Sequence, residues 1–136
     1  MPGWISLALI VAALLLAGAP ASAGAGTLVR YDKSGGLAGL HIEVAVSTTG
    51  SVRVDDDRQH APRRKTLSAR RLSALRRALR AARFSTLRRR YESKAQIADG
   101  FVETVRYAGR SVTVKTEGRP PARLRKVLAL LDALAG

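Results

Sequence analysis

SARRLSALRRALRAARF, residues 68–84, is the amphipathic segment around which the rest of this chain can be organised. Its apolar side chains recur three or four residues apart, so they share one face of a helix, and its arginines fall on the other side. The apolar face consists of Leu72, Leu75, Ala78, Leu79 and Ala82. Ser68 is the predicted N-cap. The segments around this helix suit strands, and a half-buried sheet needs a helix to cover its apolar face.

Short segments before the helix predict the first strands of that sheet. Thr27–Lys33 is followed by Leu40–Val46, in which apolar residues alternate strictly, and then by a short strand at Val52–Val54. His60–Leu67 is a candidate fourth strand, which Pro62 restricts to an edge or a bulge. These segments predict short strands of an antiparallel sheet.

FVETVRYAGRSVTVKTE, residues 101–117, is the clearest hairpin, with a two-residue turn at Ala108–Gly109. This turn predicts three cross-strand pairs: Tyr107 with Arg110, Val105 with Val112, and Glu103 with Val114. Glu103 then falls on the apolar face of the hairpin. We expect it to pair with an arginine or to lie at the sheet margin, and a functional carboxylate is a third interpretation.

A second helix is predicted at the C-terminal end of the sequence. Gly118–Pro121 stops the hairpin and starts this helix. Its apolar stripe comprises Leu124, Val127, Leu128, Leu131 and Leu134. The predicted fold class is therefore α+β: an antiparallel sheet of four to six short strands, with the two helices packed on one face and the other face more polar.

The first 23 residues have the features of a secretory signal peptide. Trp4–Gly18 is nearly all apolar, Pro20 follows, and Ala21-Ser22-Ala23 forms an A-x-A cleavage site. An uncleaved anchor is the alternative, although the apolar run is shorter than the roughly 20 residues of a spanning helix. We predict a secreted or extracytoplasmic protein whose residues 24–136 form a single domain.

Composition and motifs favour a binding module over an enzyme. The chain has no cysteine, which excludes disulfides, thiolate metal sites and a cysteine nucleophile. Its two histidines, His41 and His60, lack a zinc-ligand spacing, so no metal is expected. Neither a nucleophile elbow nor a phosphate-binding or dinucleotide fingerprint is present, so no catalytic residue and no cofactor is predicted.

The chain is strongly basic, with 24 Lys and Arg against 10 Asp and Glu and a net charge of +14. This balance indicates either an anionic partner or charge that only maintains solubility. The candidate residues for an anionic partner are Arg70, Arg76, Arg77, Arg80, Arg83, Arg88, Arg89 and Arg90. A membrane-surface helix typically carries Trp or Phe on its apolar side. Here that side is Leu and Ala, as in a helix that faces a core.

Several stretches, taken in order, resemble the emfourin family, small bacterial proteins named after a protein inhibitor of the thermolysin-like zinc protease protealysin. The matching stretches are the SGGLAG loop at 34–39, the Leu-rich helix at 68–84, Asp99-Gly100-Phe101 with the hairpin containing Tyr107 and Gly109-Arg110, and Glu117-Gly118 with Pro120-Pro121 and the terminal helix. Together they cover roughly residues 27–135.

The resemblance implies a protein inhibitor of a thermolysin-like metallopeptidase, and the signal peptide predicts that it is secreted. Because the chain has no thiol and no histidine pair to capture zinc, the expected route is occlusion of the active-site cleft. We expect a monomer without a small-molecule cofactor. The inhibitory loop candidates are Ser34, Gly35, Gly36, Leu37, Ala38 and Gly39. Leu37 is the one side chain there able to fill an apolar subsite. In the alternative interpretation the glycines only shape a bend and Leu37 joins the core. The alternative function is a basic secreted module that binds anionic polymers or a membrane surface.

Overall fold

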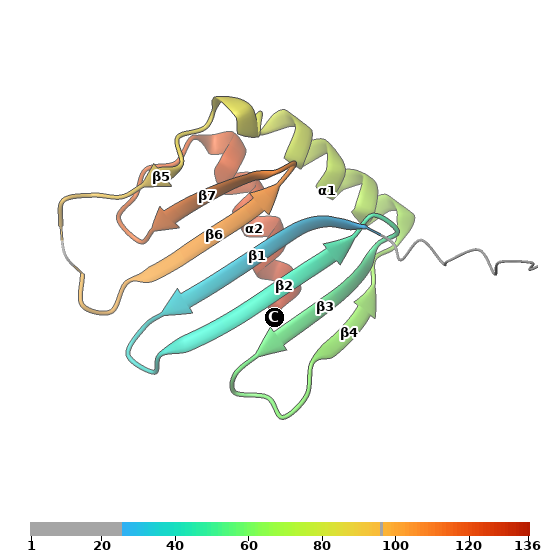
Figure 1. Cartoon of the computed structure of the whole chain (residues 1–136), viewed down its shortest axis with the longest axis horizontal. Coiled ribbons are helices and arrows are strands. Elements are labelled where there is room, and N and C mark those ends of the chain that lie inside the picture. Colours follow the sequence, from blue (N-terminus) through green and yellow to red (C-terminus); the bar gives the residue numbers. More distant parts are fainter. Residues whose placement is uncertain (1–25, 96) are drawn as a thin grey trace, which may run out of the picture.

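The computed structural model describes residues 26–95 and 97–136. The predicted signal peptide and its cleavage site lie outside this part of the chain. The described residues form a seven-stranded sheet with two α-helices, an α+β fold as predicted (Figure 1). Neither described helix has the length and apolar character that crossing a membrane requires.

The strands lie in the order β4-β3-β2-β1-β6-β7-β5 across the sheet. Their bounds are β1 (Thr27–Gly35), β2 (Leu40–Ser47), β3 (Ser51–Asp56), β4 (Arg63–Thr66), β5 (Arg90–Tyr91), β6 (Phe101–Tyr107) and β7 (Arg110–Lys115). The helices are α1 (Ala69–Ala81) and α2 (Ala122–Ala135), with a short 3₁₀ turn η1 (Phe84–Thr86). As predicted, β4 is an edge strand, and the Ser68 hydroxyl accepts a hydrogen bond from the Arg71 N–H at the start of α1.

The prediction of four to six antiparallel strands is confirmed only in part, because the sheet has seven strands and one of its pairings is parallel. The difference is β5, which runs parallel to β7 at the edge of the sheet. The Thr113 N–H donates to the Arg89 carbonyl at 2.9 Å beside it. A strand of two residues within Arg88–Tyr91 has no apolar alternation, so its sequence contains no strand signal.

Both helices cover the same face of the sheet, as predicted (Figure 1). Inward-facing side chains of the strands and of the two helices form one aliphatic core. Its fully buried members include Val29, Val44, Val46, Val52, Val54, Leu79, Val105, Val112, Leu124, Val127 and Leu131. The periods of 2 in the strands and 3.6 in the helices therefore bring every apolar stripe into one interior.

The β6–β7 hairpin has the predicted register. Ala108 and Gly109 adopt φ values of 50° and 74°, the left-handed pair that a two-residue hairpin turn requires. The three predicted pairs are confirmed, including Glu103 opposite Val114. Glu103 thus lies on the helix-covered face, and its partner is Tyr31 rather than an arginine.

Tyr31 in the central strand β1 is fully buried, and its hydroxyl donates to Glu103 Oε1 at 2.6 Å. The same hydroxyl lies 3.2 Å from Asp132 Oδ1 of α2, which also accepts from Lys33 Nζ at 2.8 Å. Burial first, and then the hydrogen bond to Glu103, raise the pKa of Tyr31 far above its usual range. The Tyr31 hydroxyl in the core is thereby hydrogen-bonded to side chains of β6 and α2.

We expect the free energy of unfolding to fall as the pH rises above about 10, where tyrosine ionises in an unfolded chain. The folded protein keeps Tyr31 protonated, so ionisation then favours the unfolded chain, by up to about 1.4 kcal/mol per pH unit. In Tyr31→Phe the free energy of unfolding should fall less steeply with pH, whereas Tyr107→Phe should keep the slope of the unmodified protein. Urea unfolding at a series of alkaline pH values measures it. Identical slopes for Tyr31→Phe and the unmodified protein would contradict the role of this hydroxyl.

Candidate functional site

The glycine segment nominated from the sequence, residues 34–39, connects β1 to β2 at one end of the sheet (Figure 1). Ser34 and Gly35 still belong to β1, so the tip is shorter than predicted and runs from Gly36 to Gly39. The side chain of Leu37 is 90% exposed. The interpretation in which Leu37 joins the core is therefore wrong.

The conformation of this tip depends on its glycines and on a contact with the start of β6. Gly35, Gly36 and Gly39 adopt φ values of 120°, 77° and 61°, where L-residues are strained. The Gly36 N–H donates to the Gly100 carbonyl at 3.3 Å, and a Cβ on Gly36 would lie 3.1 Å from the Phe101 ring. Two stretches that lie far apart in the sequence, 34–39 and 99–101, thus meet in one structural unit.

A second exposed apolar side chain lies at the same end of the sheet. Ile97 is 43% exposed on the connection from β5 to β6. The pairing of Gly35 with Phe101 brings this connection to the end of the sheet that carries Leu37. Sequence reasoning did not nominate Ile97, because the segment from 85 to 100 lacks periodicity.

The eight arginines proposed for an anionic partner do not form one compact cluster. Four lie on α1, Arg83 follows it, Arg88 and Arg89 lie in the connection, and Arg90 is in β5. All are exposed except Arg76, which is half-buried and donates to the Thr48 carbonyl. Among the described residues, no carboxylate oxygen lies within 4.0 Å of any of the eight. Their charge therefore faces solvent without an acidic partner.

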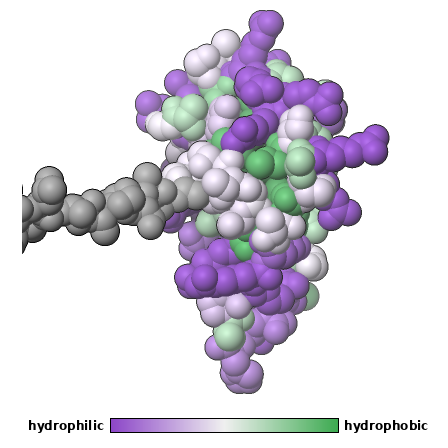
Figure 2. Space-filling model, turned by 90° about the vertical axis from the view of Figure 1, so that its right-hand side faces the viewer, coloured by the Kyte–Doolittle hydropathy of each residue, from purple (hydrophilic) through white to green (hydrophobic). Residues whose placement is uncertain are grey.

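These arginines belong to a longer acid-free stretch. Thirteen of the 24 Lys and Arg fall between Asp57 and Glu92, where no Asp or Glu occurs, so this stretch accounts for +13 of the net +14. It begins before the edge strand β4, crosses the strand ends as α1 and finishes in the opposite edge strand β5 (Figure 1). We call residues 58–91 the basic rim. Figure 2 shows its α1 side, where hydrophilic side chains project around a few hydrophobic residues.

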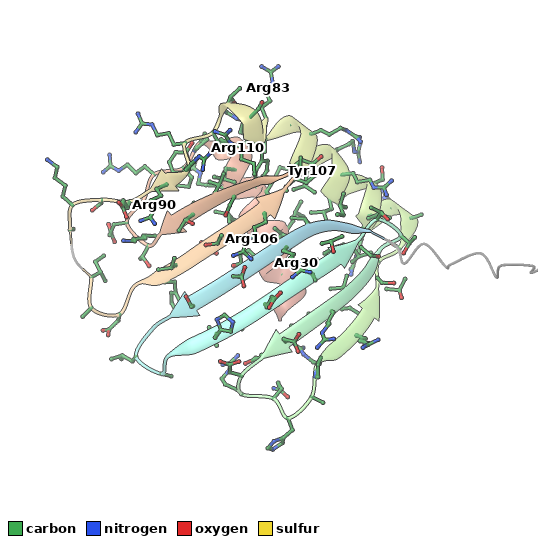
Figure 3. The ribbon with its side chains drawn as sticks, in the orientation of Figure 1. Arg30, Arg83, Arg90, Arg106, Tyr107 and Arg110 are labelled. Carbon is green, nitrogen blue, oxygen red and sulfur yellow. The ribbon has the colours of Figure 1, made fainter. Side chains whose placement is uncertain are left out.

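The uncovered face of the sheet has a different charge pattern. One cross-strand row aligns Arg106, Arg30, Arg53 and Arg64, and the neighbouring row aligns Asp32, Glu43 and Asp55. Three arginines pair with these acids, at N–O distances of 3.4 Å for Arg106–Asp32, 3.5 Å for Arg30–Glu43 and 2.8 Å for Arg53–Asp55. Figure 3 shows Arg30 and Arg106 together on this face. The open face is thus nearly neutral, so the excess charge belongs to the rim.

No three His, Cys, Asp or Glu residues in the part of the chain that the structure describes are grouped so as to hold a metal ion. A comparison with models of known protein families gives no match to this chain, and a comparison with curated proteins gives none either.

Gly35→Ala should disrupt the loop far more than Gly39→Ala. A Cβ on Gly35 would lie 2.3 Å from the Gly100 carbonyl oxygen, whereas one on Gly39 would have no neighbour within 4 Å. We expect a loss of about 3 kcal/mol in the free energy of unfolding for Gly35→Ala and about 1 kcal/mol for Gly39→Ala. Urea unfolding of both variants measures the difference. Equal losses would show that the contact with Gly100 does not restrain the loop.

Proposed function

We propose that this chain is a protein inhibitor of a thermolysin-like metallopeptidase, on its resemblance to the emfourin family, and that it is secreted, on its predicted signal peptide. The observation that carries the proposal is the 90% exposure of Leu37 at the tip of a hairpin loop. Three positive-φ glycines permit the turn, and the hydrogen bonds from Gly36 to Gly100 and from Gly39 to Gly36 restrain it. A loop that is restrained before binding pays little ordering cost when it enters a cleft, and this favours affinity.

The physical route is occlusion of the cleft by a small tip with one apolar side chain. Gly36, Ala38 and Gly39 flank Leu37 with almost no side-chain bulk, so the backbone can approach a protease surface closely. Burying a leucine side chain in an apolar subsite contributes roughly 2 kcal/mol. Capture of the catalytic zinc is not part of this route, because the chain has no thiol and its two histidines belong to different elements, β2 and the β3–β4 connection.

Titration of the purified protein against a panel of secreted thermolysin-like proteases tests the proposal, with a serine protease as the control enzyme. Leu37→Ala should raise the inhibition constant about 30-fold, which corresponds to about 2 kcal/mol. Leu37→Asp should abolish inhibition, since it places a charge in the subsite. Ser73→Asp, an exposed position on α1, makes the same change in charge and should leave inhibition intact.

Two results would overturn this function or its site. Absence of both inhibition and complex formation at micromolar concentration with every protease would overturn the function. Inhibition that is unchanged in folded Leu37→Asp would move the site elsewhere, and Ile97→Asp would then test the 85–100 segment.

A second candidate function is binding of anionic polymers, and the basic rim is the observation that favours it. Eight of its arginines, at positions 70, 76, 77, 80 and 83 and at 88–90, have no carboxylate oxygen within 4.0 Å among the described residues, and all of these except Arg76 are exposed. The rim extends between the two edges of the sheet. Such a surface attracts a flexible polyanion without requiring a shaped pocket.

Binding to double-stranded DNA, used as a model polyanion of known charge spacing, should weaken steeply with salt, because counterions are released. Replacing Arg70, Arg77 and Arg83 together by Gln should make the slope of log K against log salt shallower by about 1 to 3. The matched control replaces Arg30, Arg53 and Arg106 by Gln, which removes the same charge from the salt-bridged open face. Equal slopes for the two triple variants would rule out the rim as the binding surface.

A further inference from the structure

Three arginines from separate elements line one hollow of about 520 Å³ beside the β6–β7 turn. Arg80 comes from the last turn of α1, Arg89 from the connection to β5, and Arg110 from the start of β7. The hydroxyl-bearing residues Ser85 and Ser111 line the same hollow. Figure 3 shows Arg110 at this corner of the molecule, close to where α1 ends. The fold thus gathers donors that are far apart in the sequence.

Among the described residues no acidic side chain lines this hollow, unlike the neighbouring one. The neighbouring hollow of about 410 Å³ also has three arginines along its lining, but Glu92 and Glu117 line it too. The cations of the first hollow therefore have no acidic side chain beside them in the lining. An anion bound in this hollow would therefore interact with arginines whose charge is not neutralised by a carboxylate in the lining.

Arg110 gives the hollow a positioned donor. Its Nη2 donates to the Leu87 carbonyl at 3.0 Å, which holds the guanidinium against the chain. The Arg110 Nε is buried and has no hydrogen-bond partner among the described residues. No carboxylate oxygen lies within 4.0 Å of this guanidinium among the described residues. A partly buried cation of this kind gains from an anionic ligand, because its charge is costly to leave unpaired.

The remaining wall of the hollow is apolar. Leu79 is fully buried beneath it, and the rings of Phe84 and Tyr107 pack edge to face with centroids 5.2 Å apart. Aromatic rings beside cationic donors suit a ligand that joins an anionic group to an apolar or ring-shaped group.

We propose that this hollow binds the phosphate group of a phosphate monoester. A monoester phosphate carries a charge of about −1.5 to −2 and three acceptor oxygens, which matches three guanidinium donors better than a singly charged, planar carboxylate does. Two sources share this chemistry, a small free ester and a terminal phosphate on a polymer. The site is independent of the inhibitory loop, because six residues of β1 separate the register of Tyr107 from that of Phe101, about 20 Å along the strand.

Calorimetric titration of the purified protein with phenyl phosphate, inorganic phosphate and acetate at equal, low ionic strength tests the site. We expect phenyl phosphate to bind more tightly than inorganic phosphate because of the aromatic wall, and acetate to bind least. Arg89→Gln should weaken phenyl phosphate binding about tenfold, the loss expected for a charge-assisted hydrogen bond. Arg88→Gln is the matched control, since the adjacent, equally exposed arginine does not line this hollow, and it should change the affinity less than twofold.

An oligonucleotide with and without a 5′-phosphate distinguishes the two sources. Tighter binding of the phosphorylated form indicates a polymer end, and equal binding alongside tight phenyl phosphate binding indicates a small ester. Both outcomes support the site only if Arg89→Gln weakens phosphate binding and if Arg110→Gln also weakens it while remaining folded. Equal effects of Arg88→Gln and Arg89→Gln would overturn the site in favour of diffuse charge. Acetate binding as tightly as phenyl phosphate, or no heat with any phosphate, would also overturn it.

Discussion

The register of the central strand β1 is the constraint on which both faces of this protein depend. Val29 and Tyr31 face the helices, and Arg30 and Asp32 face solvent in the paired arginine and acidic rows. A slip of one residue against β2 and β6 would place Arg30 in the aliphatic core and expose Tyr31. The aliphatic core and the salt-bridged rows therefore require the same alignment of β1 with β2 and β6.

Tyr31 also connects this register to α2 and to the candidate inhibitory loop. Its hydroxyl satisfies Glu103 across the sheet and lies near Asp132, to which Lys33 also donates. The Lys33 ammonium lies 5.1 Å from the centroid of Phe101, and the Phe101 ring packs against Gly36 at the base of the loop. A satisfied polar cluster in a low-dielectric interior is sensitive to geometry, so it favours one arrangement of strand, helix and loop.

The parts of this fold that depend on local sequence were predictable, and the parts that depend on long-range pairing were not. The α1 stripe, its Ser68 cap and the β6–β7 register follow from periodicity and turn chemistry within a few residues. The parallel strand β5 follows from where the chain arrives after α1, and Arg90–Tyr91 has no pattern of its own. The same holds for the site. The exposed loop and the rim arginines were nominated from sequence, whereas the open-face rows and the meeting of Arg80, Arg89 and Arg110 require the strand order.

The candidate inhibitory loop and the α1 part of the basic rim lie at opposite ends of β1, and this separation defines what the α1 arginines can contribute to the loop. Leu37 lies beyond Gly35, whereas the β6–β7 turn and the end of α1 lie beyond Val29, about 20 Å away along the strand. The Debye length is about 8 Å at physiological ionic strength, so the charges at the end of α1 are largely screened at the loop. Contacts made by Leu37 then derive their free energy from apolar burial and restraint of the loop. On the proposed function, the α1 arginines instead affect the rate and orientation of approach to an acidic protease surface, an effect that decreases with salt and leaves the dissociation rate of the loop unchanged.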